Sequence, residues 1–327
     1  MKLAVLGAGA WGTAITISLA PRHAITLWAR DARHAEEITA ARSNERYLPG
    51  FSLPPAVAVT SRIEIALTDV ELVLVATPTA GLGEVLPHIG ARGIPVVWLC
   101  KGFDAASTWL PHQIARRELP PQLPRAVLSG PSFAQEVAQG LPTALTLASE
   151  DFGFAERIAR ELHHDRLRIY SADDVVGIEV AGAVKNVIAI AAGISDGLGL
   201  GYNARAALIT RGLAEITRLG LKLGGRLETF MGLAGVGDLV LTCTGELSRN
   251  RNVGLGLAQG MTLPSILGSL GHVAEGVHTA RVASRLAREL AVEMPITQAV
   301  CRVMDENAAP RVAVQELLAR DPKPEQC

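Results

Sequence analysis

The chain begins with KLAVLGAGAWG, residues Lys2 to Gly12, and this segment predicts the architecture of the whole first half. Leu3–Leu6 is a short apolar run typical of a buried strand, and Thr13–Ala20 has the composition of a helix. Between them lies a glycine turn with the spacing G-x-G-x-x-G, which has meaning only in this strand–turn–helix context. We therefore predict a βα unit whose turn binds the pyrophosphate of a dinucleotide.

The three glycines of the turn have different expected roles. Gly7 permits the tight turn, Gly9 lets the backbone approach a pyrophosphate, and Gly12 lets the helix pack on the strand. The helix N-terminus then offers free N–H groups and the positive end of its dipole to the phosphates. Because glycine turns are common, an ordinary βα turn is the competing interpretation.

The residue after the second predicted strand, Ile25–Ala29, bears on the choice of cofactor. In the NAD-specific pattern an acidic residue at this place binds the ribose hydroxyls, but this chain has Arg30. A guanidinium can bind a 2′-phosphate through two hydrogen bonds. We therefore predict NADP or NAD as cofactor. The alternative is that Arg30 is a solvated residue at a strand end.

Further strands alternate with helical segments up to about residue 171, which favours a largely parallel, doubly wound, Rossmann-like sheet. The remaining segments predicted to be strands are 57–59, 69–76, 96–100, 126–128, 142–147 and 167–170. Ligands bind at the carboxyl ends of such strands. Lys101 and the segment Ser129–Ala134, which each follow a predicted strand, are therefore candidate ligand contacts. A tight turn is the alternative for Ser129–Ala134.

Composition limits the class of protein. With 327 residues, of which 49% are hydrophobic and 19% charged, the chain is long and apolar enough for two domains. The net charge of −1 gives no electrostatic reason to expect nucleic acid or an anionic membrane as a partner. The four cysteines are widely spaced, which suits a reducing compartment and gives no sign of a metal site: Cys100, Cys243, Cys301 and Cys327.

No segment has the pattern of a membrane anchor or a signal peptide. The N-terminus reads as a strand, and the longest uninterrupted apolar stretch, Val187–Ile194, is too short to cross a bilayer. We therefore expect a cytoplasmic protein without membrane insertion. The apolar helices of the second half favour a homodimer.

The second half, from Val175 on, lacks strand signals and predicts an all-α domain over residues 175–327, after a dinucleotide-binding domain over residues 1–174. Val175–Gly193 reads as one almost wholly apolar helix with Lys185 and Asn186 in its middle. Burial disfavours the charged amine and lowers its pKa from about 10.4. Gly182 and Ala189 beside it are small enough to leave room for a ligand. Alternatively, Lys185 reaches solvent or pairs with Glu179.

Two more polar groups lie in the second half. Gly235 and Gly237 flank a predicted turn that presents Asp238. Ser248–Asn252 is a polar run whose arginine, asparagine and serine donors could hold a phosphate. On composition alone, this run is equally well explained as a solvated loop.

Together these motifs resemble the NAD(P)-dependent sn-glycerol-3-phosphate dehydrogenases of the bacterial type, over nearly the whole chain. The resemblance rests on GAGAWGTA (7–14), NERYLPG (44–50), SGPSFAQEVAQGLPTA (129–144), EVAGAVKNVIAIAAGISDGLGLGYNARAALITRG (179–212), GLAGVGDLVLTCTGELSRNRNVG (232–254) and AEGV (274–277). It implies hydride transfer between a nicotinamide and the C2 atom of dihydroxyacetone phosphate or glycerol 3-phosphate. It also implies reduction as the physiological direction, which supplies glycerophospholipid synthesis.

The resemblance also implies roles for single residues. Lys185 corresponds to the general base or acid at C2, and Asp238 to a residue that contacts substrate hydroxyls or holds Lys185. The implied substrate-binding residues are Lys101, Gly130, Ser132, Lys185, Asn186, Asp238, Ser248, Arg249 and Asn250. The implied cofactor-binding residues are Gly7, Gly9, Ala10, Trp11, Gly12, Arg30, Tyr47, Lys101, Ala134, Arg249, Val273 and Glu275. No metal is implied.

The sequence departs from the family pattern at Ala10, where serine is common. One hydroxyl contact to the pyrophosphate is lost, but the backbone donors remain, so we expect binding to survive. Two alternative functions stay open at this stage. One is a dehydrogenase of the same plan that acts on a β-hydroxy acid or on ketopantoate. The other is a non-catalytic dinucleotide sensor, against which the lysine and Asp238 argue.

Overall fold

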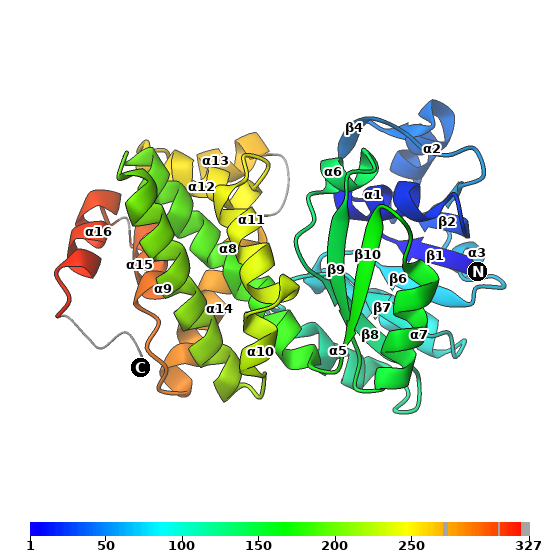
Figure 1. Ribbon diagram of the computed structural model, residues 1–327. Coiled ribbons are helices and arrows are strands. Elements are labelled where there is room, and N and C mark those ends of the chain that lie inside the picture. The colour runs from blue at the N-terminus through cyan, green and yellow to red at the C-terminus, as the bar shows by residue number, and fades with distance from the viewer. Residues whose placement is uncertain (271–273, 307, 322–327) are drawn as a thin grey trace.

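The computed structural model describes residues 1–270, 274–306 and 308–321 and divides into a sheet part and a helical part that lie side by side (Figure 1). The strands of the sheet are β1 (Lys2–Leu6), β2 (Ala24–Trp28), β5 (Ala58–Thr60), β6 (Leu72–Val75), β7 (Val96–Trp98), β8 (Arg125–Ser129), β9 (Thr143–Ala148) and β10 (Leu167–Ala172). They are arranged in the order β10-β9-β8-β7-β6-β1-β2-β5. Each predicted strand is therefore present, and all of them join one sheet.

The sheet is parallel except for one step. β8 and β9 run antiparallel, with Leu128 opposite Leu147, while β9 and β10 are parallel to each other. The expected largely parallel sheet is confirmed, but its last two strands are reversed. The cause lies in the link from β8 to β9, whose short helix α6 (Ala134–Ala138) packs against α1 (Ala10–Leu19). Because this link does not pass over the sheet to the other end of the strands, β9 begins at the end of the sheet where β8 ends, and the two strands run antiparallel.

Helices cover both faces of the sheet, as the doubly wound fold requires. In β1, Leu3 and Val5 belong to one hydrophobic cluster, whereas Ala4 and Leu6 belong to another on the opposite face. A strand buried on both faces reads as a continuous apolar run, which is why it was recognisable. The remaining helices of this part are α2 (Ala32–Ala41), α3 (Ile63–Ala66), α4 (Leu82–Gly90), α5 (Pro111–Glu118) and α7 (Phe152–Leu162), with a 3₁₀ turn η1 (Thr79–Gly81).

A small hairpin braces the glycine turn. β3 (Ser43–Asn44) and β4 (Leu48–Ser52) pair antiparallel. The buried Asn44 donates from Nδ2 to Ala8 O at 2.9 Å and to Thr13 Oγ1 at 2.7 Å. The local sequence ERYLPG hides this strand, because Pro and Gly are rare inside strands.

The second part is all-helical and is built around α8 (Val175–Gly197), as predicted. Asp174 caps α8 by accepting a hydrogen bond from Gly177 N at 2.8 Å. α9 (Gly201–Lys222), α11 (Asp238–Thr244), α12 (Arg249–Ala258) and α14 (Glu275–Glu289) pack on it. The other helical segments are α10 (Leu227–Phe230), the π-helical turn η2 (Leu233–Gly237), α13 (Leu263–Leu270), α15 (Pro295–Asp305) and α16 (Pro310–Leu318).

α8 extends beyond the predicted helix Val175–Gly193 and ends at Gly197. Its length and composition would suit a membrane span, but 89% of its most apolar window is buried inside the protein. The segment Leu227–Thr244 passes the same test of length and composition, with 39% of its window buried. The burial of α8 identifies it as the central core helix of this part.

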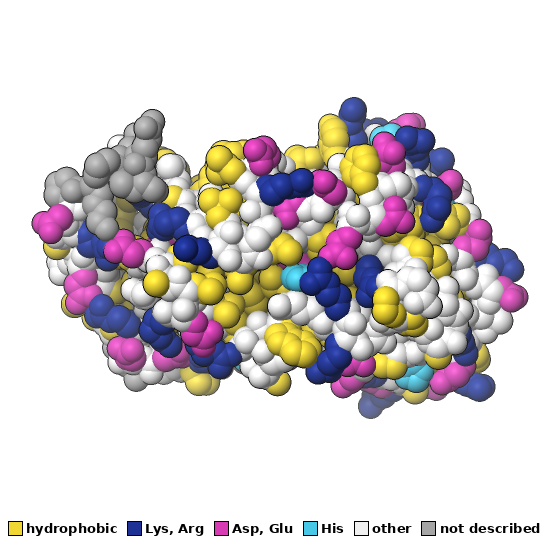
Figure 2. Space-filling view, turned by 90° about the horizontal axis from the view of Figure 1, so that it is seen from below, with side chains coloured by type: hydrophobic (Ala, Val, Ile, Leu, Met, Phe, Trp, Pro, Cys, Tyr) yellow, Lys and Arg dark blue, Asp and Glu magenta, His cyan; other side chains and the backbone are white. Residues whose placement is uncertain are grey.

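The charges on the surface are mixed. Figure 2 shows the lower face, where Lys and Arg side chains alternate with Asp and Glu and hydrophobic side chains gather in a hollow over the helical part. This distribution agrees with the net charge of −1 and shows no large basic field on this face.

Candidate active site

The glycine turn shows which of its glycines the fold itself requires. Gly7 has a φ of 120°, and a Cβ there would lie 2.7 Å from the carbonyl carbon of Ala76. A Cβ on Gly12 would lie 1.9 Å from Gly7 O. A Cβ on Gly9, the N-cap residue of α1, would meet nothing within 4 Å. The open space at Gly9, in front of a helix N-terminus, fits the phosphates of a dinucleotide.

Other predicted cofactor residues lie around this turn. Ala10, Trp11 and Ala134 pack against one small hydrophobic cluster formed by Ala14, Leu48 and Val137. α1 and α6 therefore pack together beside the glycine turn, and each contributes residues that were predicted to contact the cofactor.

Two predicted cofactor residues follow or neighbour β2 and α2. Arg30 has a side chain 78% exposed and lies 3.4 Å from Glu84. Tyr47 stacks edge-on against His34, with 5.1 Å between the ring centroids. Val273 lies outside the described residues.

Three elements deliver the polar groups of a buried lysine–carboxylate cluster. Lys185 of α8 donates from Nζ to Asp238 Oδ1, and to Thr242 Oγ1 at 3.0 Å. Lys101, which follows β7, donates to Asp238 Oδ2 at 2.7 Å and to Gly130 O at 3.0 Å. Asp238, the first residue of α11, is 1% exposed. One carboxylate thus joins the lysines of both parts of the molecule.

The electrostatics of this cluster favour a neutral amine at accessible pH. Burial lowers the pKa of Lys185 to about 8, and the charge of Lys101 acts in the same direction against the attraction of Asp238. Burial tends to raise the pKa of Asp238, but Lys101 and Lys185 outweigh it and hold that pKa below its usual value. The carboxylate therefore remains ionised while Lys185 can exchange a proton.

The alternatives considered for Lys185 do not match the structure. The residue is only 6% exposed, so it does not reach solvent along the protein surface. Glu179 is occupied elsewhere, by Trp98 and His112. The space at Gly182 is not free for a ligand, because a Cβ there would lie 3.1 Å from Ser129 Oγ and 3.6 Å from Lys101 Cγ. Gly182 makes room for Lys101 instead.

The polar run Ser248–Asn252 begins a helix and is not a solvated loop. Ser248 is the N-cap of α12, and its hydroxyl accepts from Arg251 N at 3.2 Å. Arg249 and Asn250 lie in the first turn, and Asn250 Oδ1 accepts from Gly276 N at 3.1 Å. A helix N-terminus with an arginine in its first turn is a favourable place for a phosphate.

α12 is held tightly against α8. A Cβ on Gly193 would lie 2.0 Å from Arg251 O, and one on Gly254 would lie 2.0 Å from Ile190 O. Arg251 Nε also donates to Asp196 Oδ2 at 2.8 Å. This contact fixes the first turn of α12 relative to the helix that carries Lys185.

The remaining predicted residues lie near the same cluster. Burial raises the pKa of Glu275, while the positive charges of Arg249, Lys101 and Lys185 oppose this shift. Ser132 Oγ donates to Gly130 O at 3.0 Å, and Asn186 is 5% exposed beside Lys185 on α8. Among the described residues, no group of three His, Cys, Asp or Glu side chains is placed to hold a metal ion.

The sequence analysis missed Thr242, which forms hydrogen bonds with Lys185 and with the backbone carbonyl of Asp238. Its hydroxyl donates to Asp238 O at 2.6 Å, one helical turn back. The signal was available, because Asp238 and Thr242 are four residues apart and so share a helix face. It was not used because Asp238 was expected in a turn.

Two family profiles cover most of the chain. One, described as the NAD-dependent glycerol-3-phosphate dehydrogenase N-terminus, matches residues 2–155. The other, described as the C-terminus of the same enzyme, matches residues 174–315. A glycerol-3-phosphate dehydrogenase [NAD(P)+] of Nitrosospira multiformis is 59% identical and one of Dechloromonas aromatica is 57% identical, each over 99% of both chains.

Solved structures give the same result. The crystal structure of glycerol-3-phosphate dehydrogenase from Coxiella burnetii is 43% identical, with a TM-score of 0.93 over 98% of this chain and 99% of that one. The enzyme from Saccharomyces cerevisiae is 26% identical, with a TM-score of 0.81 over 98% and 99%. A D-mandelate dehydrogenase, at 17% identity and a TM-score of 0.61, shares the fold alone.

Proposed function

This chain belongs to the NAD-dependent glycerol-3-phosphate dehydrogenase family, and from that premise we propose which of its residues carry out the reaction. The protein is an NAD(P)-dependent oxidoreductase that interconverts dihydroxyacetone phosphate and sn-glycerol 3-phosphate. The alternatives of a β-hydroxy acid or ketopantoate dehydrogenase and of a non-catalytic sensor are not supported by these relatives.

Lys185 is the general acid and base of this proposal. The nicotinamide, when bound, exchanges a hydride with C2 of the substrate. During oxidation, neutral Lys185 Nζ takes the proton of the C2 hydroxyl, and during reduction the ammonium returns it. The observation that carries the assignment is a buried amine whose pKa is lowered to about 8 beside an ionised carboxylate. A pKa near the operating pH allows both directions.

The neighbours of Lys185 hold it and the substrate. Asp238 and Thr242 fix its Nζ through hydrogen bonds. Lys101 brings a second positive charge to the same carboxylate, from which it can stabilise negative charge that develops on the C2 oxygen. The remaining substrate contacts that we propose are Gly130, Ser132 and Asn186 around C2, and Ser248, Arg249 and Asn250 at the phosphate.

In this proposal the glycine turn and the N-terminus of α1 would hold the cofactor. The N–H groups of α1 and the open space at Gly9 would hold the pyrophosphate. The exposed Arg30 is free to turn towards a 2′-phosphate, so we expect NADP to be used as well as NAD. The other contacts that we propose are Gly7, Ala10, Trp11, Gly12, Tyr47, Lys101, Ala134, Arg249, Val273 and Glu275.

We also propose the boundaries and the setting of the enzyme. The dinucleotide-binding domain spans residues 1–174 and the helical domain 175–327, since Asp174 caps the first helix of the second part. An apolar groove of about 1140 Å³ between α9, α15 and α16 supports a homodimer. Free thiols at Cys100, Cys243 and Cys301 support a cytoplasmic location. The physiological direction is reduction, which supplies glycerophospholipid synthesis.

Replacement of Lys185 tests the central assignment. We expect Lys185→Ala to lower kcat by about 10²–10⁴-fold in both directions, because the proton carrier is lost. The loss of NADPH or NADH absorbance at 340 nm with dihydroxyacetone phosphate gives the rate, and fluorescence titration gives cofactor affinity, which should be unchanged. The matched control is Lys2→Ala, at an exposed lysine that begins β1. Turnover by Lys185→Ala close to that of the wild type would remove Lys185 from its role.

A further inference from the structure

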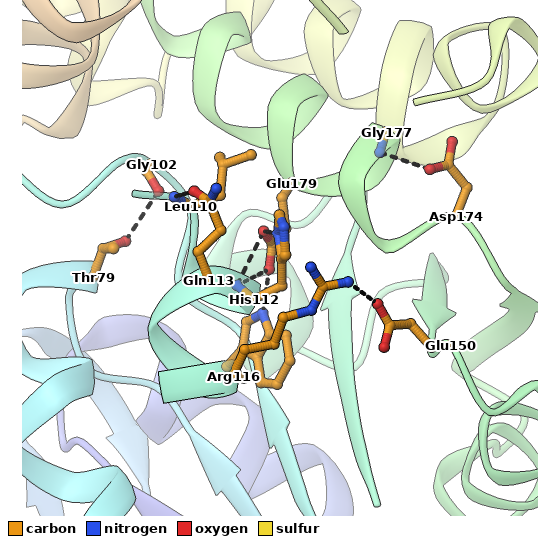
Figure 3. Close-up of polar contacts among 11 residues, drawn as sticks. Thr79, Gly102, Leu110, His112, Gln113, Arg116, Glu150, Asp174, Gly177 and Glu179 are labelled. Atoms are coloured by element: carbon orange, nitrogen blue, oxygen red, sulfur yellow. Dashed lines mark hydrogen bonds and ion pairs between the residues drawn. The ribbon is translucent and has the colours of Figure 1, made fainter. Parts of the chain in front are cut away.

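A second buried carboxylate joins the two parts of the molecule. Glu179 lies in the second turn of α8, is 4% exposed, and points towards His112 of α5 (Figure 3). Its Oε1 accepts from Trp98 Nε1 at 2.7 Å and from His112 N at 2.9 Å. Its Oε2 accepts from His112 Nδ1 at 2.6 Å. All three donors belong to the sheet part, whereas Glu179 belongs to the helical part.

These bonds account for the carboxylate fully. A buried carboxylate is costly unless its oxygens are hydrogen-bonded, and here each oxygen has at least one short bond. His112 N belongs to the first turn of α5, where helix N–H groups lack partners within the helix. Glu179 therefore satisfies one of these free donors as well as two ring N–H groups.

The positions of these residues along the chain connect them to the active site. Trp98 is the last residue of β7, and Lys101 follows three residues later. Glu179 precedes Lys185 by six residues on the same helix, a rise of about 9 Å at 1.5 Å per residue. The bond from Trp98 to Glu179 thus ties the strand that delivers Lys101 to the helix that delivers Lys185. Both lysines meet at Asp238.

We propose that Glu179, through its bonds to Trp98 and His112, is a positioning residue that sets the relative placement of Lys101 and Lys185 at Asp238. The proposal rests on the function assigned above to the two lysines. Glu179 does not touch the reacting atoms. It fixes the position of α8 relative to β7. A misplacement of about 1 Å at a reacting centre can lower the rate by about 10²-fold.

We call Glu179 with its hydrogen-bond partners Trp98 and His112 the joint. Glu179→Gln changes the joint with little change in side-chain volume. Oε1 can still accept from Trp98 and from His112 N, but the amide NH₂ takes the place of Oε2. It then faces His112 Nδ1 and can no longer accept the second, 3.2 Å bond from His112 N. The imidazole must then carry its proton on Nε2 and accept at Nδ1. The change therefore moves one proton, lengthens one short bond and removes one longer bond, and the fold is expected to survive.

The experiment separates positioning from folding. For wild type and Glu179→Gln we measure kcat per cofactor-binding site, KM, cofactor affinity, and the isotope effect with NADPH deuterated at the transferred position. We expect kcat per site to fall by about 10–100-fold with cofactor affinity unchanged, and the isotope effect to rise as hydride transfer becomes slower. A merely structural role would lower the number of active sites and leave kcat per site and the isotope effect unchanged, which would overturn the proposal.

Two further variants and one spectrum keep the outcomes distinct. Trp98→Phe removes one donor and should lower kcat per site in the same direction by a smaller factor. Glu150→Gln, which removes an exposed ion pair of Arg116 beside the joint, should change neither quantity (Figure 3). Nitrogen NMR should show His112 protonated at Nδ1 in the wild type and at Nε2 in Glu179→Gln. An unprotonated Nδ1 in the wild type would contradict the joint.

The Lys185→Ala result tells which assignment fails. If that variant is inactive and Glu179→Gln has a normal kcat per site, only the positioning role is wrong. If Lys185→Ala is active, the function assigned to the lysine is wrong, and the role of Glu179 falls with it.

Discussion

The glycine turn and the cluster around Asp238 are built in opposite ways. The turn takes its six residues, Gly7 to Gly12, from one continuous segment. The cluster joins Asp238 to Lys185, 53 residues away, and to Lys101, 137 residues away. The first site therefore depends mainly on the backbone geometry of one segment, and the second depends on how the two parts of the molecule pack. Substitutions at the two sites should therefore impair the protein for different reasons.

Two substitutions within the turn test whether its role in folding can be separated from its role in cofactor binding. We expect Gly12→Ala to lower the free energy of unfolding by about 3 kcal/mol and to abolish cofactor binding, because its Cβ would lie 1.9 Å from Gly7 O. Gly9→Ala is the matched variant, since its Cβ meets no atom within 4 Å. It should keep the stability of the wild type but lower the affinity for the cofactor, because the methyl group occupies the space proposed for the pyrophosphate.

Denaturant unfolding and fluorescence titration with NADPH measure both quantities for this pair. Equal losses of stability in Gly9→Ala and Gly12→Ala would show that the turn has no separate binding position.

Substitutions in the cluster around Asp238 should lower the catalytic rate more than the stability of the protein. We expect Asp238→Asn to lower kcat by about 10²-fold, since both lysines lose the carboxylate that orients them. The pH profile gives the sign. Oxidation needs neutral Lys185 and so should rise with pH through about 8, whereas reduction should fall over the same range. Because the charge of Asp238 raises the pKa of Lys185, its removal should move both profiles to lower pH.

Initial rates in both directions between pH 6 and 10 test this, with Asp305→Asn as the control carboxylate, which pairs with Arg281 and not with Lys185. A profile of Asp238→Asn that moves to higher pH would contradict the assignment of the titrating group.

The smallest expected effect concerns Arg30, which belongs to the local site but reaches outwards. Arg30→Ala should lower kcat/KM for NADPH relative to NADH by about tenfold, the loss of a charge-assisted contact. Its ion pair with Glu84 is exposed, so stability should be unchanged. Glu84→Gln is the control, because it frees Arg30 without removing it. An unchanged ratio of the two cofactors would show that Arg30 stays in solvent.

The same contrast explains what the sequence could predict. β1, the turn and α8 were predictable because their signals are local: an apolar run, glycine spacing and a long apolar helix. The reversal of β9 was not, since it depends on how α6 packs against α1. Lys185 could be selected as unusual, but its partner could not be chosen between Glu179 and Asp238. That choice is made by the packing of α11 on α8.

The start of α12 shows a third kind of limit. Ser248–Asn252 reads as polar loop or phosphate site, because serine caps and solvated loops have the same composition. Only the close crossing of Gly193 and Gly254 with the backbone of the partner helix requires a helix there. A glycine's reason is visible only once its neighbour is known.

The burial of α8 also matters while the chain is being made. The helices that cover most of it, α9, α11, α12 and α14, follow it in the sequence, so an emerging chain presents this largely apolar segment of 23 residues before their cover exists. Such a segment resembles an insertion signal for the translocation machinery. Lys185 near its centre adds about 2.5–3.5 kcal/mol to the cost of placing it in a bilayer. The side chain proposed to carry the proton therefore also makes insertion of this helix into a bilayer less favourable.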